Sequence, residues 1–173
     1  MQTLSNELKD VIGRHLQIAG PRRVLAIASA LCLEDAPAAD TQAIAQSIRP
    51  RFEIIDHDQV LDHETGLIWL RDYVPGGKRR WSDSLTAAAS TTVGGHKWRA
   101  PTIREQLSIV DYERVNPAFD TDVFRGAADW VWTSTPDKES PGDYAWLVNF
   151  NGGGSGRGSQ GYSGFVRAVR VGQ

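Results

Sequence analysis

Six tryptophans, all after residue 68, occur in an ordered series of short segments in this 173-residue chain. Burial of a tryptophan side chain removes a large apolar surface from water, so we expect most of these tryptophans to lie in the core of a small domain. Trp130 and Trp132 are two residues apart in a predicted strand and therefore point to the same face. Either both are buried or both form an exposed platform suited to stacking on sugar rings.

The composition predicts one globular domain with an appendage. Hydrophobic residues make up 40% of the chain and charged residues 23%, which is typical of a packed core rather than of disorder. The net charge of -2 is not that of a nucleic-acid-binding protein, which needs a basic excess or a clustered basic face. Because Cys32 is the only cysteine, the chain can form neither an intramolecular disulfide nor an all-cysteine metal site.

Residues 1–50 predict a small helical module. Apolar residues recur every three or four positions over residues 3–18, Pro21 can open a second helix that runs to about Leu33, and Asp40 can cap a third that ends at Pro50. Three short helices bury little surface alone. The module therefore either packs against the rest of the chain or serves as an oligomerisation or docking element within a larger assembly.

The apolar run at residues 24–33 bears on localisation. It follows two arginines, as in a signal peptide, but the leader before it contains Glu7 and Asp10 and has its own helical periodicity. We therefore predict no signal peptide. The run is also about half the length that spans a bilayer, so we predict no membrane span. The location stays open, with an extracellular surface and a virion as alternatives.

After Pro50 the pattern changes to the period of two that β-strands have. A turn at 62–66 predicts a hairpin, because Asp62 can bond to backbone amides and Gly66 accepts a positive φ. A helix at 81–89 is predicted with Ser82 as its cap, and Thr102 to Glu105 form a capping box for a second helix. The predicted strands are 52–55, 59–61, 67–70, 129–132, 145–150 and 165–171.

Five segments of the chain carry a family resemblance. They are 62–69 (DHETGLIW), 98–105 (WRAPTIRE), 130–135 (WVWTST), 144–146 (YAW) and 164–170 (GFVRAVR). In this order they resemble the C-terminal domain family of bacterial collagen-like adhesins, the Lcl C-terminal domain, over about residues 52–173. The resemblance implies an α+β, C-type-lectin-like domain with small mixed or antiparallel sheets and two short helices. It also implies that Trp130 and Trp132 are buried and that the last strand returns to pair near the first.

The sequence contains no recognisable catalytic or metal-binding motif. His15, His57, His63 and His96 lack metal-ligand spacing, and the polar cluster at 56–63 is typical of a strand edge and turn. Oxidases that share the implied fold use a cysteine pair. Calcium-dependent lectins of this fold use Glu-Pro-Asn or Gln-Pro-Asp with Trp-Asn-Asp, and none of these strings occurs here. We predict no enzyme activity, no metal and no cofactor.

Residues 149–163 are rich in glycine, serine, asparagine and tyrosine, which is typical of adaptable recognition loops. The alternative is an ordinary flexible connection between two strands. The predicted ligand contacts in this segment are Asn151, Ser155, Arg157, Gln160 and Tyr162.

Together these patterns predict a non-enzymatic recognition or adhesion protein. It would bind a glycan, a polyanion or a surface protein through the loop at 149–163, and it would form a homo-oligomer or larger assembly through residues 1–50. The first alternative is a decoration or host-attachment component of a phage virion or surface fibre. The second is an uncharacterised enzyme on this fold. No nucleic-acid partner is predicted.

Overall fold

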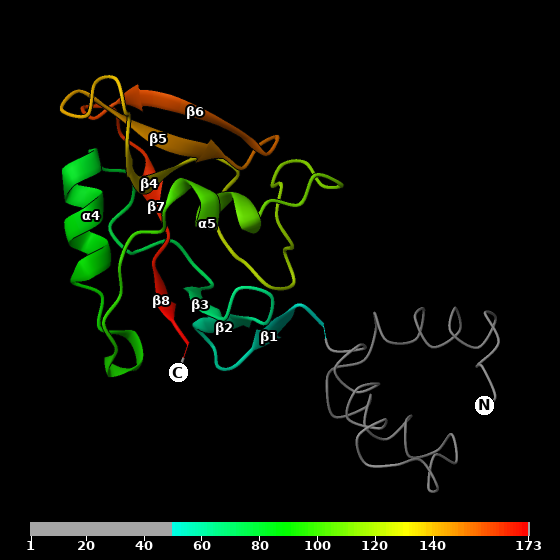
Figure 1. Cartoon of the computed structure of the whole chain (residues 1–173). Helices are drawn as coiled ribbons and strands as arrows, with labels where there is room; N and C mark the ends of the chain where they lie inside the picture. The colour runs from blue at the N-terminus through cyan, green and yellow to red at the C-terminus, as the bar shows by residue number, and fades with distance from the viewer. Residues whose placement is uncertain (1–49, 173) are drawn as a thin grey trace, which may run out of the picture. The chain divides into compact units, whose positions relative to one another are not determined.

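The computed structural model of the protein describes residues 50–172. They form an α+β domain with two four-stranded sheets and two short helices, as Figure 1 shows. The predicted α+β class is therefore confirmed, whereas the helices predicted before Pro50 lie outside the described residues. No helix in the described part of the chain is long and apolar enough to cross a membrane.

The first sheet consists of β1 (Phe52–Ile54), β2 (Gln59–Asp62), β3 (Leu67–Leu70) and β8 (Val169–Val171). The order is β1-β2-β3-β8, and all neighbours are antiparallel. The predicted hairpin is confirmed, with Leu61 opposite Ile68 and with Gly66 at a φ of 69° in the turn.

The turn between β2 and β3 is organised by Asp62, which is fully buried. Its carboxylate accepts hydrogen bonds from the Thr65 hydroxyl at 2.9 Å and the Glu64 backbone N–H at 3.0 Å, and it pairs with the Arg51 guanidinium at 2.9 Å. Burial raises the pKa of Asp62, but the hydrogen bonds from Arg51, Thr65 and Glu64 outweigh burial and hold this pKa below its ordinary value.

We expect Asp62→Asn to lower the free energy of unfolding by about 1–2 kcal/mol at neutral pH, because the neutral amide loses the ion pair with Arg51 and has one acceptor oxygen in place of two. Since the folded pKa is depressed, the carboxylate stabilises the fold above its unfolded pKa of about 3.9, and this contribution is lost as pH falls through the folded pKa. Denaturant titrations at neutral and at acid pH measure the effect. A difference between the two proteins that stays constant with pH would contradict it.

The second sheet consists of β4 (Trp130–Pro136), β5 (Tyr144–Asn149), β6 (Gly154–Ser159) and β7 (Phe165–Val166). The order is β6-β5-β4-β7. β7 runs parallel to β4, and the other neighbours are antiparallel.

The C-terminal segment differs from the single strand predicted at 165–171. It is divided between the sheets, since β7 pairs with β4 and β8 pairs with β3. The break falls at Arg167 and Ala168, both fully buried where the chain passes from one sheet to the other. β8 joins the sheet that contains the first strand, but its neighbour is β3, and β1 lies at the opposite edge.

Two short helices, α4 (Trp81–Ala89) and α5 (Ile103–Ser108), pack against the second sheet. The predicted capping box of α5 is confirmed, because the Thr102 hydroxyl accepts from the Glu105 N–H and the Glu105 carboxylate accepts from the Thr102 N–H. The prediction that Ser82 caps α4 is wrong. The helix begins at Trp81, as predicted, but its N-cap is Arg80, two residues before Ser82, and Arg80 makes no side-chain capping hydrogen bond.

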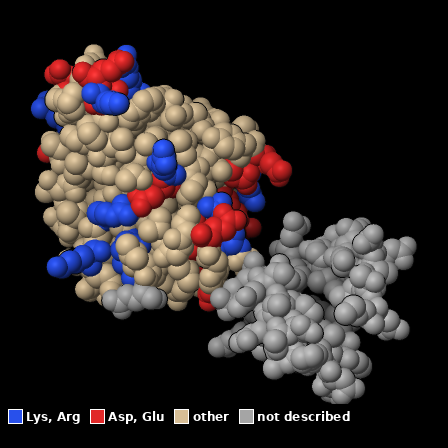
Figure 2. All heavy atoms as spheres, in the orientation of Figure 1, with Lys and Arg blue, Asp and Glu red and all other residues tan. Residues whose placement is uncertain are grey.

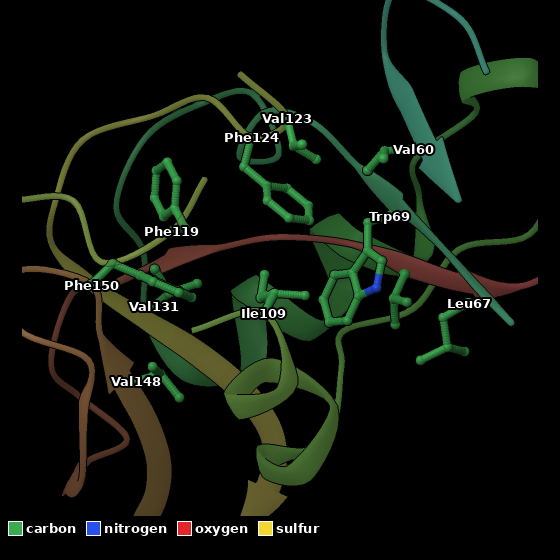
Figure 3. Close-up of a cluster of buried hydrophobic side chains, with 11 residues drawn as sticks. Val60, Leu67, Trp69, Ile109, Phe119, Val123, Phe124, Val131, Val148 and Phe150 are labelled. Carbon is green, nitrogen blue, oxygen red and sulfur yellow. The ribbon is translucent and has the colours of Figure 1, made fainter. Parts of the chain in front are cut away.

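The aromatic residues form the core that the tryptophan series predicts. Figure 3 shows Trp69 near Phe124, and their ring centroids are 6.5 Å apart in an edge-to-face contact. Trp98 is buried in a second cluster, and Trp132 is fully buried in a third. Trp130 packs against that third cluster and is half-buried, so the inward orientation of Trp130 and Trp132 is confirmed.

A fully buried arginine, Arg167, joins distant segments of the chain. Its guanidinium donates hydrogen bonds to the carbonyl oxygens of Leu70 and Arg71, and to that of Arg125 at 2.7 Å. The Tyr73 ring lies 4.7 Å from the guanidinium carbon. Burial lowers the pKa of Arg167, which is held by backbone carbonyls and aromatic rings rather than by a carboxylate.

Candidate ligand-binding face

The segment predicted as a recognition loop, residues 149–163, has a β-strand, β6, at its centre. β6 pairs with β5 along its whole length, from Ser159 opposite Tyr144 to Gly154 opposite Asn149. The turn at 150–153 is closed by a hydrogen bond of 2.8 Å from the Gly153 N–H to the Asn149 carbonyl. The centre of the segment is therefore a paired strand rather than a loop, with a turn at 150–153 before it and residues 160–163 after it. It forms the edge strand of the second sheet, drawn in orange in Figure 1.

Glycines at alternate positions let β6 lie close to the core. A Cβ atom on Gly156 would lie 3.3 Å from Cη2 of Trp130, and one on Gly158 would lie 2.9 Å from Cδ1 of Leu147. This face of the strand therefore has little room for side chains. Because side chains alternate along a strand, those of the intervening residues project from the other face.

The opposite side of the hairpin brings two of the predicted contacts beside two aromatic residues. Arg157 lies opposite Trp146, and Ser159 lies opposite Tyr144, so these side chains share one face with Ser155. Trp146 is half-buried, and Tyr144 is 42% exposed. We call this surface the hairpin face, and it consists of Tyr144, Trp146, Ser155, Arg157 and Ser159.

Arg157 is held in place by two carboxylates. Its Nη1 lies 3.1 Å from the carboxylate of Glu139 and 3.2 Å from that of Asp137. Glu139 and Asp137 raise the pKa of Arg157. Figure 2 shows acidic and basic side chains mixed at the top of the molecule, where Figure 1 draws β5 and β6. Two carboxylates beside one guanidinium leave no local excess of positive charge, so this face has no electrostatic attraction for a polyanion.

The other three predicted contacts lie apart from the hairpin face. Asn151 is exposed in the turn beyond one end of β6. Gln160 follows the other end, and its side-chain amide donates a hydrogen bond of 2.9 Å to the Pro141 carbonyl. Tyr162 is 47% exposed, and its ring meets that of Trp132 edge-on, on the glycine side of the hairpin. The structure thus brings Ser155 and Arg157 together, and not all five residues.

The histidines of the polar cluster make separate contacts. His57 Nδ1 lies 2.6 Å from Asp58 on the surface, and His63 Nε2 lies 2.8 Å from Glu53. The predicted turn is confirmed, but the predicted strand edge is wrong, because β2 pairs with β1 on one side and with β3 on the other. Within residues 50–172, no three His, Cys, Asp or Glu side chains converge on a point that could hold a metal ion.

Sequence reasoning missed Tyr144 and Trp146 as parts of a candidate site. One available signal was the glycine at every second position of 154–158, which indicates a strand with one face against bulky residues. The other was their own spacing of two, which places both on one side of β5. The pairing of Trp146 with Arg157 and of Tyr144 with Ser159 depends on the length of the turn, and the composition of 149–163 does not determine that length.

Comparison with known proteins supports the resemblance carried by the tryptophan segments. No curated protein matches the chain. The model of the Lcl C-terminal domain family matches residues 58–170, which is more than half of the chain and runs from just before β2 into β8. The match includes the whole hairpin face. The resemblance is therefore confirmed, and the chain belongs to the Lcl C-terminal domain family.

Proposed function

We propose that this domain is a non-catalytic recognition module with a role in adhesion, built on a C-type-lectin-like scaffold, and that it binds a neutral glycan on the hairpin face. The adhesion role rests on the family, which takes its name from collagen-like adhesins and is associated with adhesion rather than catalysis. The ligand class rests on the chemistry of the hairpin face.

The choice of ligand rests on one observation, which is that aromatic ring surface lies beside hydroxyl and guanidinium groups. Tyr144 and Trp146 offer apolar surface on which the hydrophobic side of a sugar ring can stack. Ser155 and Arg157 offer donors and acceptors to sugar hydroxyls at the same face. Because Glu139 and Asp137 balance the charge of Arg157, a neutral glycan fits this face better than a polyanion.

The hairpin face is also preorganised. The glycine side of β6 rests against Trp130 and Leu147, and the two carboxylates restrain Arg157. Little conformational freedom is therefore lost when a ligand binds, which favours affinity from a small contact. Residues 1–50 remain the proposed oligomerisation element, through which several weak sites would act together.

Two half-exposed tyrosines on opposite sides of the hairpin provide a matched test. Tyr144→Ser removes ring surface from the hairpin face, and Tyr162→Ser removes a similar ring from the glycine side. We expect Tyr144→Ser to weaken binding to the best neutral glycan on an array by at least about tenfold, and Tyr162→Ser to leave it unchanged. Thermal melting of both variants controls for folding.

Three outcomes would contradict this function. Loss of binding only in Tyr162→Ser would place the site on the other side of the hairpin. Equal binding by both variants and the wild type would remove the hairpin as the site. Absence of any glycan binding by the full chain, together with saturable binding to a surface protein, would replace the glycan by a protein ligand.

A further inference from the structure

A groove of about 500 Å³ lies at the edge of the first sheet, whereas the hairpin face belongs to the second sheet. One wall is formed by residues 95–99, which begin at the end of the short helix η1 (Val93–Gly95). The other wall is the end of β8, with Arg170 and Val171. The groove thus separates two chain segments that are hydrogen-bonded to each other just beyond it.

An interrupted strand pairing opens this groove. The Arg99 N–H donates to the Val169 carbonyl at 3.0 Å, and the Val169 N–H donates to the Arg99 carbonyl at 2.8 Å. In a continued antiparallel pair, the next residues to exchange hydrogen bonds would be Lys97 and Val171. Within the described residues these two are not bonded to each other, because the chain before Lys97 turns away into η1.

The backbone of Val171 faces this gap. The Leu70 N–H donates to the Ala168 carbonyl, so the even-numbered residues at this end of the chain bond toward β3. Val169 directs its backbone groups the other way, toward Arg99. Since alternate residues of a strand point their backbone groups to the same side, Val171 presents its N–H and C=O to the groove, and its carbonyl also accepts a long hydrogen bond of 3.4 Å from Arg170 Nη1. Its side chain is 68% exposed. This end of β8 is therefore an open strand edge.

Cationic side chains border the open edge, as Figure 2 shows around the end of the described chain. Arg99 pairs with Glu105 at 2.6 Å and is balanced by it. Arg170 instead bonds the amide oxygen of Gln59, and its guanidinium lies 5.4 Å from the Trp98 ring. Across residues 50–172, no carboxylate forms an ion pair with Lys97 or Arg170.

We propose that this groove binds an extended acidic segment of a partner protein, which adds as a strand beside β8. Backbone hydrogen bonds to Val171 would fix the segment, and its carboxylates would meet Lys97 and Arg170. A peptide can hydrogen-bond to the strand edge and also pair with the cationic side chains, whereas an acidic polysaccharide can only pair with the cations. The peptide is therefore the better fit. This site stands independently of glycan binding at the hairpin face.

The test uses the full chain and a fluorescent peptide of alternating glutamate and valine, about eight residues long, because side chains alternate along an added strand. Fluorescence anisotropy should show saturable binding. We expect the double variant Lys97→Gln/Arg170→Gln to weaken it by at least about tenfold. The matched control is Lys138→Gln, an exposed lysine next to the second sheet, which should bind as the wild type does.

Two further arms separate strand addition from charge attraction. A peptide of the same sequence, N-methylated at alternate backbone nitrogens, keeps every carboxylate but loses hydrogen-bond donors, and it should bind at least about tenfold more weakly. Heparin provides the polysaccharide arm and should compete poorly. Equal binding of the methylated peptide, or binding of heparin without binding of the peptide, would overturn the proposal. Lys97→Gln alone, which leaves the contact of Arg170 with Trp98 intact, should show a smaller loss in the same direction.

Discussion

Replacement of Arg167 by methionine is expected to lower the free energy of unfolding of the domain by about 3–5 kcal/mol. The guanidinium is fully buried and serves the carbonyl oxygens of Leu70, Arg71 and Arg125. Methionine has a similar length but no donor, so the carbonyls of Leu70 and Arg125 lose this partner, at about 1–3 kcal/mol for each buried group. The Arg71 carbonyl keeps the hydrogen bond of 2.7 Å from the Arg125 N–H. Methionine also avoids the cost of burying a charge, and this gain offsets part of the loss in stability.

Urea denaturation followed by tryptophan fluorescence measures this change, with Arg170→Met as the matched control. Arg170 is half-buried, lies over the Trp98 ring and donates to one buried acceptor, the Gln59 amide oxygen. We expect its replacement to lower the free energy of unfolding by about 1–2 kcal/mol, less than that of Arg167. Arg167→Lys keeps the charge but lacks the forked donors of a guanidinium, so it should remain well below the wild type. A stability of Arg167→Met within about 1 kcal/mol of the wild type would show that the carbonyls find other donors.

The role of Arg167 could not be predicted from the sequence, although the segment around it was singled out. Alternation predicted one strand at 165–171 with Arg167 and Arg170 on opposite faces, and arginine is rarely buried without a partner. The division of this segment depends on two pairings distant in sequence, β7 with β4 and β8 with β3. The local sequence pattern does not determine which sheet a two-residue strand joins.

The elements that were predicted correctly are those whose interactions are local. The turn from Asp62 to Gly66 determines the β2–β3 hairpin, and Thr102 and Glu105 satisfy each other within three residues. The sequence did not predict β6, because glycine and serine do not favour strands by themselves. Gly156 and Gly158 are explained by the large side chains of Trp130 on β4 and Leu147 on β5. Ser155 and Arg157 were named as contacts, but the rings beside them depend on strand register.

The second large effect is expected from Gly158→Val, which should lower the free energy of unfolding by about 2–3 kcal/mol. Valine ordinarily favours a strand over glycine by up to about 1 kcal/mol, so propensity alone predicts the opposite sign. Packing decides here, because the new Cβ would lie 2.9 Å from Cδ1 of Leu147. Leu147 is 2% exposed and packs against the fully buried Trp132, which leaves it little space to move.

Ser159→Val is the matched control, since it places the same side chain on the adjacent residue of β6 but on the hairpin face. Its cross-strand neighbour on that face, Tyr144, is 42% exposed and has room to move, so strand propensity should prevail, and the control should be as stable as the wild type or slightly more so. Urea denaturation of the two variants therefore compares the two faces of one strand. If both valines were tolerated equally, the glycine side would not rest on the core, and the rigidity that we ascribe to the hairpin face would lose its physical basis.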